Sequence, residues 1–103
     1  MAQHVTFFRM KVQPGKIDEM KQLVTDRGAE NRRQSGAGWE STVAGQSKDD
    51  PNTFWVAVTW DTSERYYANA EDPKQHEWYE RMRALLESDP EWFDCDVIEE
   101  QRA

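Results

Sequence analysis

A histidine, a tryptophan and a tyrosine stand close together in the segment "AEDPKQHEWYERM", residues 70–82. Histidine is the side chain whose charge changes nearest to neutral pH, so His76 is the residue of this segment that could do acid–base chemistry. At the mouth of a pocket it could act as a general base toward a bound ligand. On the solvent side of a helix it would only be solvated, and the surrounding elements decide between the two.

The segment itself predicts a helix. Asp72 is a typical N-cap, Pro73 a typical first helical residue, and Pro90 ends the pattern, so we expect a helix over about 73–88. At about 100° per residue, one face of this helix collects the side chains of Trp78, Tyr79, Met82, Leu85 and Leu86. His76 lies about 120° from that face, which favours the solvated interpretation and makes Trp78 the core anchor. The pocket interpretation stays open, because the first turn borders the loop after Asn69.

The rest of the chain supplies the elements that position this helix. Alternating apolar residues predict strands over 4–12, 39–45, 53–60 and 91–100, and helical spacing predicts a helix from Lys16 to about Arg33. Asp61, with Glu64 three residues later, predicts the N-cap of a short helix through Ala70. The order β-α-β-β-α-β is that of a ferredoxin-like split βαβ fold, an α+β class with a four-stranded antiparallel sheet. We expect a single domain over residues 1–103.

Both faces of the predicted sheet carry apolar residues. Phe7 and Phe8 point to opposite faces of one strand, and Trp55 and Val56 do the same in another. Two helices can cover only one face of a four-stranded sheet, and a face in water should be polar. We therefore expect a homodimer in which the second face packs against the sheet of a partner.

Composition excludes several classes of partner and cofactor. The net charge is −7, and the basic residues cluster only at Arg27, Arg32 and Arg33, late in a predicted helix. Nucleic acid and anionic membrane are therefore not expected partners. Cys95 is the single cysteine, and no apolar run could form a signal peptide or a membrane span, so we expect a cytoplasmic protein. With two distant histidines, one cysteine makes a zinc site unexpected, and we predict no metal.

Three stretches give the chain a resemblance to a known family. They are "GAGW" at the second strand, "DPNTFWVAVTW" at the third, and "WDTSERYYANAEDP" after it. With these stretches the chain resembles the antibiotic biosynthesis monooxygenase group of dimeric α+β barrels along nearly its whole length. The resemblance implies a pocket between the sheet and the helices of each subunit. It marks the superfamily better than the activity, since members include oxygenases, isomerases and haem-degrading enzymes.

The resemblance also implies site residues. In the cofactor-free, quinone-forming oxygenases, a tryptophan at the end of the third strand and a tyrosine six residues later line the pocket. These positions are Trp60 and Tyr66 here, which implies catalytic roles for both. Asn69 and Tyr79 would be substrate-binding residues, with His76 beside them.

The chain departs from the family pattern at several positions. Those oxygenases have an asparagine where Val56 stands, and an arginine near the position of Tyr79. Many relatives have a glutamate where Val58 stands. The haem-degrading members use an asparagine, a tryptophan and a histidine, and their positions align with Phe8, Asn69 and Tyr79 here. Haem degradation is therefore not expected.

Each implied site residue also has a purely structural interpretation. Trp60 ends a buried strand face and could be an ordinary core tryptophan. Tyr66 and Tyr67 are adjacent, so only one of them can point inward, and the family spacing favours Tyr66. Tyr66 could be a core tyrosine with its hydroxyl at the rim, and Asn69 could be a helix C-cap that needs no pocket.

Two functions follow from these residues. The first is a cofactor-independent monooxygenase that oxidises a small polycyclic phenol or anthrone with O2. The alternative is a non-catalytic dimer that binds a small aromatic ligand in the same pocket. In either case we expect an aromatic site without a buried Arg or Lys, which suits a flat aromatic ligand better than an anion.

Overall fold

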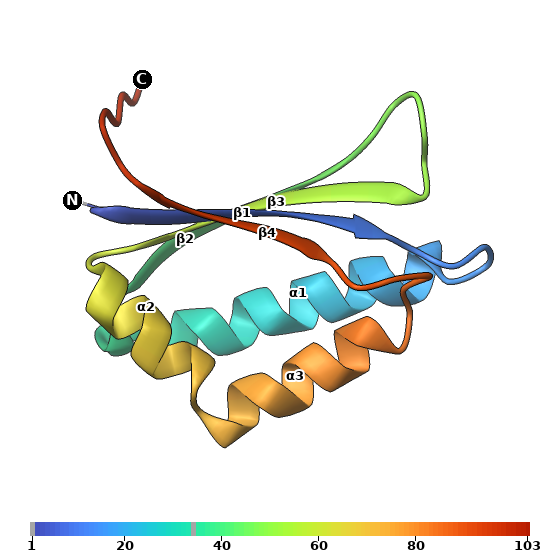
Figure 1. Ribbon diagram of the computed structural model, residues 1–103, viewed down its shortest axis with the longest axis horizontal. Helices are drawn as coiled ribbons and strands as arrows, with labels where there is room; N and C mark the ends of the chain where they lie inside the picture. Colours follow the sequence, from blue (N-terminus) through green and yellow to red (C-terminus); the bar gives the residue numbers. More distant parts are fainter. Residues whose placement is uncertain (1, 34) are drawn as a thin grey trace.

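Four antiparallel strands form one sheet, and helices cover one of its faces (Figure 1). The strands are β1 His4–Lys11, β2 Trp39–Gln46, β3 Thr53–Trp60 and β4 Glu91–Asp96, arranged in the order β2-β3-β1-β4. The helices are α1 Ile17–Arg33, α2 Ser63–Ala70 and α3 Pro73–Arg83, with a 3-10 turn at Ser35–Ala37. This arrangement confirms the predicted ferredoxin-like α+β fold.

The structure is a computed structural model that describes residues 2–33 and 35–103, without the side chains of residues 29, 31–33 and 35. Of the predicted basic cluster, only Arg27 can therefore be placed, because the side chains of Arg32 and Arg33 lie outside the described residues. No helix within these limits is long and apolar enough to cross a membrane.

The central strand β1 organises the sheet because it pairs with β3 on one side and with β4 on the other. Side chains alternate between the two faces of a strand, so every second residue of β1 points toward the helices. These inward residues include Met10 and Val12, which pack with others into one core: Met10, Val12, Met20, Leu23, Phe54, Val56 and Leu86. Nearer the start of β1, the buried inward residues are His4 and Thr6. The inward face is therefore apolar at one end and polar at the other.

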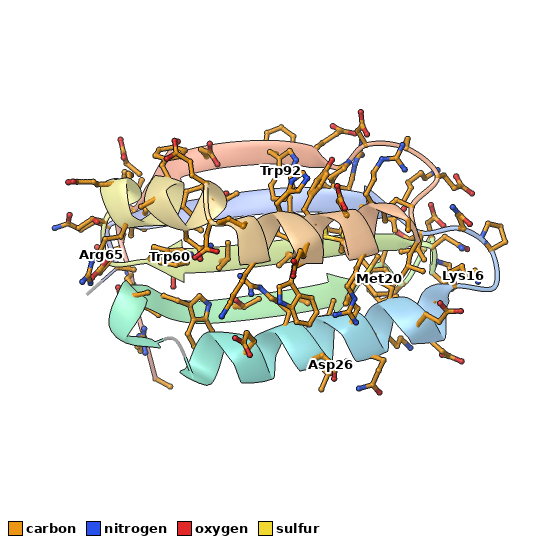
Figure 2. The ribbon with its side chains drawn as sticks, turned by 90° about the horizontal axis from the view of Figure 1, so that it is seen from below. Lys16, Met20, Asp26, Trp60, Arg65 and Trp92 are labelled. Atoms are coloured by element: carbon orange, nitrogen blue, oxygen red, sulfur yellow. The ribbon has the colours of Figure 1, made fainter. Side chains whose placement is uncertain are left out.

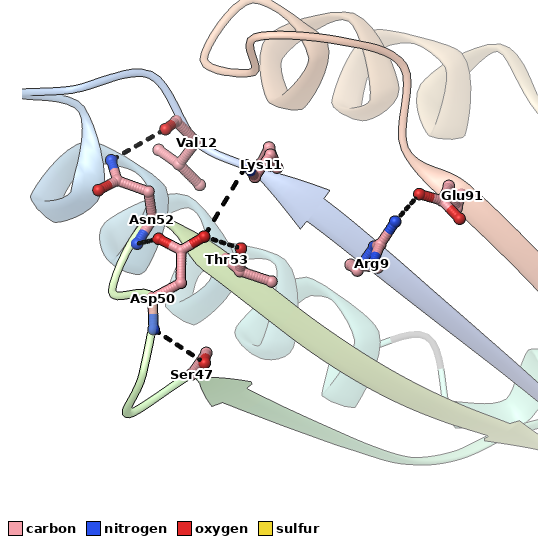
Figure 3. Close-up of polar contacts among 8 residues, drawn as sticks. All are labelled: Arg9, Lys11, Val12, Ser47, Asp50, Asn52, Thr53 and Glu91. Carbon is pink, nitrogen blue, oxygen red and sulfur yellow. Dashed lines mark hydrogen bonds and ion pairs between the residues drawn. The ribbon is translucent and has the colours of Figure 1, made fainter.

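Side-chain hydrogen bonds hold the turn between β2 and β3 (Figure 3). Asp50 accepts from the hydroxyl of Thr53 at 2.8 Å and from the backbone N–H of Asn52 at 3.2 Å. These two hydrogen bonds lower the pKa of Asp50, since they favour its ionised form. The Asn52 side chain in turn donates to the backbone oxygen of Val12 at 3.0 Å. The turn is thereby tied to the end of the neighbouring strand.

The start of α2 corrects one prediction. The N-cap is Thr62, whose side chain accepts a hydrogen bond from the backbone N–H of Arg65 at 3.2 Å. Asp61, which was predicted as the cap, instead pairs with the side chain of Arg65 at 2.7 Å. Its carboxylate also approaches Gly38, where an added Cβ would lie 2.5 Å from Asp61 Oδ1. Asp61 is therefore turned toward the second strand, and the cap moves one residue along.

The prediction for α3 is confirmed at the start of the helix and wrong at its end. Asp72 caps its first turn, as predicted, with Pro73 in the first helical position. The predicted extension to about Ser88 is wrong, because the helix ends at Arg83. After the helix, Leu86 forms an isolated β-bridge with Val12. Helical periodicity cannot reveal such a long-range pairing. The last strand is also shorter than the predicted 91–100, and residues 97–103 form no regular element.

The face of the sheet away from the helices carries a row of large apolar side chains. Its large exposed side chains come from all four strands, with exposed fractions of 43% for Phe7, 69% for Val43, 48% for Trp55 and 48% for Phe93. Phe7 and Phe93 are direct neighbours in the β1–β4 pairing, and Val43 and Phe7 both flank Ala57. Arg9 borders this row and pairs with Glu91 (Figure 3). Its guanidinium also lies over the Trp55 ring at 5.6 Å. The predicted second apolar face is therefore present.

Trp78 and His76 occupy different sides of α3. Trp78 is half-buried and packs against the core, with the guanidinium groups of Arg27 and Arg81 over its ring at 5.6 and 4.5 Å. His76 is exposed and pairs with Glu80 at 2.9 Å.

We expect Trp78→Ala to lower the free energy of unfolding by about 2–4 kcal/mol, somewhat less than for a fully buried tryptophan. His76→Ala should change it by no more than about 0.5 kcal/mol, as is usual for exposed positions. Chemical denaturation of both variants measures the two effects. Equal losses would contradict the described orientation of α3.

Candidate functional site

A cavity lies between the sheet, α1 and the α2–α3 segment. Its volume is about 140 Å³. That is smaller than the roughly 300–1,000 Å³ usual for small-molecule sites. The wall is mostly aromatic and aliphatic, and its rings are those of Phe8, Trp39, Trp60, Tyr66, Trp78, Tyr79 and Trp92. Figure 2, a view from the helix side, shows Trp60 between α1 and α2.

The cavity wall contains four of the five predicted site residues. Trp60 from the end of β3, Tyr66 and Asn69 from α2, and Tyr79 from α3 all line it. His76 does not line this cavity. It lines a neighbouring hollow of about 220 Å³, which shares Tyr66, Asn69 and Tyr79 with the cavity. The exposed imidazole of His76 and its pairing with Glu80 match the solvated interpretation of this residue.

The two adjacent tyrosines have different surroundings. Tyr66 is half-buried, stacks on the ring of His4 at 4.3 Å, and meets the edge of Trp60 at 6.1 Å between ring centres. A tyrosine hydroxyl is protonated at neutral pH and can donate a hydrogen bond. Burial raises the pKa of Tyr66 further, while a side-chain hydrogen bond with Thr6 acts in the opposite direction. Tyr67 is 47% exposed, and its hydroxyl donates to Asp94 Oδ2 at 3.0 Å. Tyr66 is therefore the tyrosine that reaches the cavity.

Asn69 is not a helix C-cap. The C-cap of α2 is Glu71, whose backbone N–H bonds to the backbone oxygens of Tyr67 and Asn69. Asn69 itself lies within the helix, and the structure places it in the wall of the cavity and of the neighbouring hollow. The capping interpretation of its side chain is therefore excluded.

A guanidinium group lines the cavity, which corrects the expectation of a site without a buried Arg or Lys. Arg27 of α1 lies in the wall, half-buried, and donates a hydrogen bond to Gln75 Oε1 of α3. Burial lowers the pKa of Arg27, and the nearby carboxylates of Glu30 and Asp72 act in the opposite direction. The family resemblance implied an arginine near Tyr79 on α3. In this chain the cation comes from the other helix.

Sequence analysis also missed a polar cluster beside Tyr66. His4 is 1% exposed, with Nε2 at 2.7 Å from Thr6 Oγ1 and Nδ1 at 2.7 Å from Ser63 Oγ. Thr6 donates its own proton to Asp94 Oδ1 at 2.8 Å, so it must accept from His4. His4 therefore carries a proton on Nε2, while its Nδ1 lies at hydrogen-bond distance from the Ser63 hydroxyl. The cluster links α2 to β1 and β4 and fixes the ring on which Tyr66 stacks.

The sequence indicated the position of the His4 cluster but not that of Arg27. His4 and Thr6 alternate in phase with Phe8 and Met10 at the start of the first strand, which indicates that both point inward. Arg27 had no comparable signal, because its partner Gln75 is 48 positions away on another helix. Among the described residues, no group of His, Cys, Asp and Glu is arranged to hold a metal ion.

Solved structures with the same arrangement include proteins of several bacteria. A protein provisionally named an antibiotic biosynthesis monooxygenase from Caulobacter crescentus superposes with a TM-score of 0.84 at 16% identity, covering 95% of this chain and 92% of that one. Another of that provisional name from Nitrosomonas europaea has a TM-score of 0.80 at 18% identity, covering 93% and 99%. A protein of unknown function from Nitrosomonas europaea has a TM-score of 0.82 at 16% identity, covering 100% and 96%.

The chain has the antibiotic biosynthesis monooxygenase-like fold. At identities this low, the likeness shows the fold and leaves the chemistry to the residues of the cavity. No family model matches the sequence, and a search of curated proteins finds no match.

Thr6→Val tests whether the cluster around His4 holds this end of the site. The substitution keeps the shape of the side chain but leaves the buried Nε2 of His4 without its partner and removes one of the donors to Asp94. We expect a loss of about 1–3 kcal/mol in the free energy of unfolding. Thr25→Val makes the same chemical change on the exposed side of α1 and should cost no more than about 0.5 kcal/mol. Similar losses in urea denaturation for the two variants would show that the cluster contributes no special stability.

Proposed function

We propose that the cavity binds a flat phenolic aromatic molecule and that the protein oxidises it with O2 without a flavin or a metal. The observation that carries this proposal is the cavity itself, in which tryptophan and tyrosine rings from β3, α2 and α3 surround a few polar tips. Such a wall suits stacking on a planar ligand, while the polar tips orient it. The fold shared with provisionally named monooxygenases agrees with this proposal.

The protein would contribute binding and hydrogen bonding to the proposed reaction. A polycyclic phenol or anthrone becomes reactive toward O2 once it loses a proton and turns into an electron-rich anion. The hydroxyl of Tyr66, which is protonated at neutral pH, can donate a hydrogen bond to the developing anion. Trp60, whose ring centre lies 6.1 Å from that of Tyr66, has an indole N–H that would be a second donor. Asn69 and Tyr79 would orient the ligand.

The overall step consumes one O2 and needs no reductant. The ligand anion passes one electron to O2, and the resulting two radicals combine into a peroxide. Loss of the remaining C–H proton and cleavage of the O–O bond then give a carbonyl group and one water molecule. An anthrone thus becomes an anthraquinone, with both oxygen atoms of O2 accounted for.

A second candidate function is ligand binding without turnover. It is favoured by the apolar side chains at two positions of β3 where the oxygenases or many relatives of the group have an asparagine and a glutamate. These are Val56 and Val58, and both line the cavity. The same dimer would then sequester or carry an aromatic molecule.

Tyr66→Phe separates the two functions. If the site is catalytic, purified protein without added cofactor should consume O2 with an anthrone, and this variant should slow the reaction by about 10–1000-fold. Tyr67→Phe is the matched control, because its hydroxyl binds Asp94 outside the cavity, and it should keep most of the rate. An oxygen electrode and quinone absorbance measure both reactions.

Ligand binding alone would show quenching of tryptophan fluorescence without oxygen uptake. A panel of polycyclic phenols that gives neither quenching nor oxygen uptake would contradict the proposed function altogether. Equal rate losses in the Tyr66 and Tyr67 variants would contradict the role assigned to Tyr66.

The proposal includes a homodimer formed through the outer face of the sheet. The exposed row of apolar side chains crosses all four strands, so two copies related by a two-fold axis would each bury the same surface. The dimer would leave the helices and the cavity on the outside. Each subunit would then keep its own site.

We expect sedimentation at micromolar concentration to give about twice the chain mass of 12.1 kDa. Phe7→Arg places a charge in the centre of the apolar row and should shift the protein to the monomer. Thr25→Arg adds the same charge on the helix side and should leave the dimer intact. A wild-type protein that sediments only as a 12.1 kDa species would refute the interface.

A further inference from the structure

The cavity wall contains one guanidinium group in otherwise mostly aromatic and aliphatic surroundings. Arg27 reaches the cavity from α1, while Tyr66 and Asn69 reach it from α2. Figure 2 shows α1 running along one side of Trp60 and α2 along the other. A planar ligand in this cavity therefore has a cation on the α1 side and neutral hydrogen-bond donors on the α2 side.

Two residues of α3 hold the side chain of Arg27 in place. Its guanidinium lies over the ring of Trp78 at 5.6 Å and donates to the side-chain oxygen of Gln75, so α3 fixes its position. A guanidinium has five N–H donors, and the bond to Gln75 uses one of them. Glu30 and Asp72 lie near enough to act on its charge. Arg27 thus combines a fixed geometry with donors that a ligand can use.

We propose that Arg27 binds an ionised phenol oxygen of the ligand and so selects aromatic phenols that bind as anions. This inference rests on the proposed function, because it concerns the ligand of the same cavity. A cation in a half-buried site stabilises a nearby anion more strongly than it would in water. Hydrogen bonds from a guanidinium to an oxyanion are also among the stronger ones in proteins. The ligand would therefore lose its proton on binding, before any reaction with O2.

The effect of Arg27 can be measured as a change in the pKa of the bound ligand. A cation that stabilises the ionised form lowers the pKa of the bound phenol below its value in free solution. A shift of about one unit means that the ionised form binds about tenfold more tightly than the neutral form. Tyr66, which stays protonated, would donate to the other edge of the ring system.

A monohydroxyanthraquinone is a suitable probe, because its phenol and phenolate differ in visible absorbance and O2 does not consume it. Titration of the probe with and without saturating protein gives the bound and free pKa values. For the wild-type protein we expect the bound pKa to be lower by about one unit. Arg27→Met should abolish this shift, and Arg27→Lys, which keeps the charge but loses the planar fork, should retain part of it.

Arg81→Met is the matched control. Arg81 lies over the same Trp78 ring at 4.5 Å, but it is exposed and does not line the cavity. This variant removes the same charge and should leave the shift of the bound probe unchanged. Circular dichroism checks that each variant is folded, and the wild-type and Arg27→Lys titrations still decide the matter if Arg27→Met unfolds.

Quenching of tryptophan fluorescence by the probe with no change in its pKa would overturn the role of Arg27 and leave the aromatic pocket standing. If Arg27→Met and Arg81→Met reduce the pKa shift of the bound probe equally, the role of Arg27 is also overturned, because the shift would then reflect net charge alone. An absence of quenching with the probe, and with the wider panel of phenols, would overturn the pocket and this inference together.

Discussion

The alternation of side chains along β1 is the constraint on which the rest of the structure depends. This strand pairs on both sides, and a slip of one residue would turn its entire inward set to the other face. In the observed register, Met10 and Val12 join the aliphatic core, while His4 lies opposite Trp60. The cavity lies over Phe8 and Met10 and extends to Tyr66, which stacks on His4. The same register leaves Phe7 on the outer face, in the centre of the apolar row.

The fold alone says little about the chemistry. Proteins provisionally named monooxygenases and a protein of unknown function share it with this chain at similar TM-scores. Function depends on the set of side chains that the elements of this chain bring to the cavity. Val56 and Val58 make the β3 wall of the cavity apolar, and Arg27 adds a cation from α1. The chemistry therefore has to be argued from these residues, and the fold supplies only their positions.

Sequence patterns predicted the features that depend on near neighbours. Strand alternation, the α1 periodicity and the Asp72 cap each involve residues a few positions apart, and all three are confirmed. The early end of α3 could not be predicted, because it depends on Leu86 pairing with Val12, far away in the chain. For the site, the family resemblance implied Trp60, Tyr66, Asn69 and Tyr79, and all four line one cavity. Sequence analysis missed Arg27, whose position is set by packing between two helices, and it took no account of the inward phase of His4.

The α2–α3 segment closes the cavity, yet neither of its helices contains a buried residue. The segment is held by half-buried side chains such as Trp78, and by the buried residues Trp60 before it and Leu86 after it. Stability in proteins is uneven, and segments with few buried contacts open locally at a lower free energy than the sheet beneath them. We therefore expect the α2–α3 segment to exchange its amide hydrogens faster than β1. A ligand too large for any fixed opening would reach the aromatic wall through that motion.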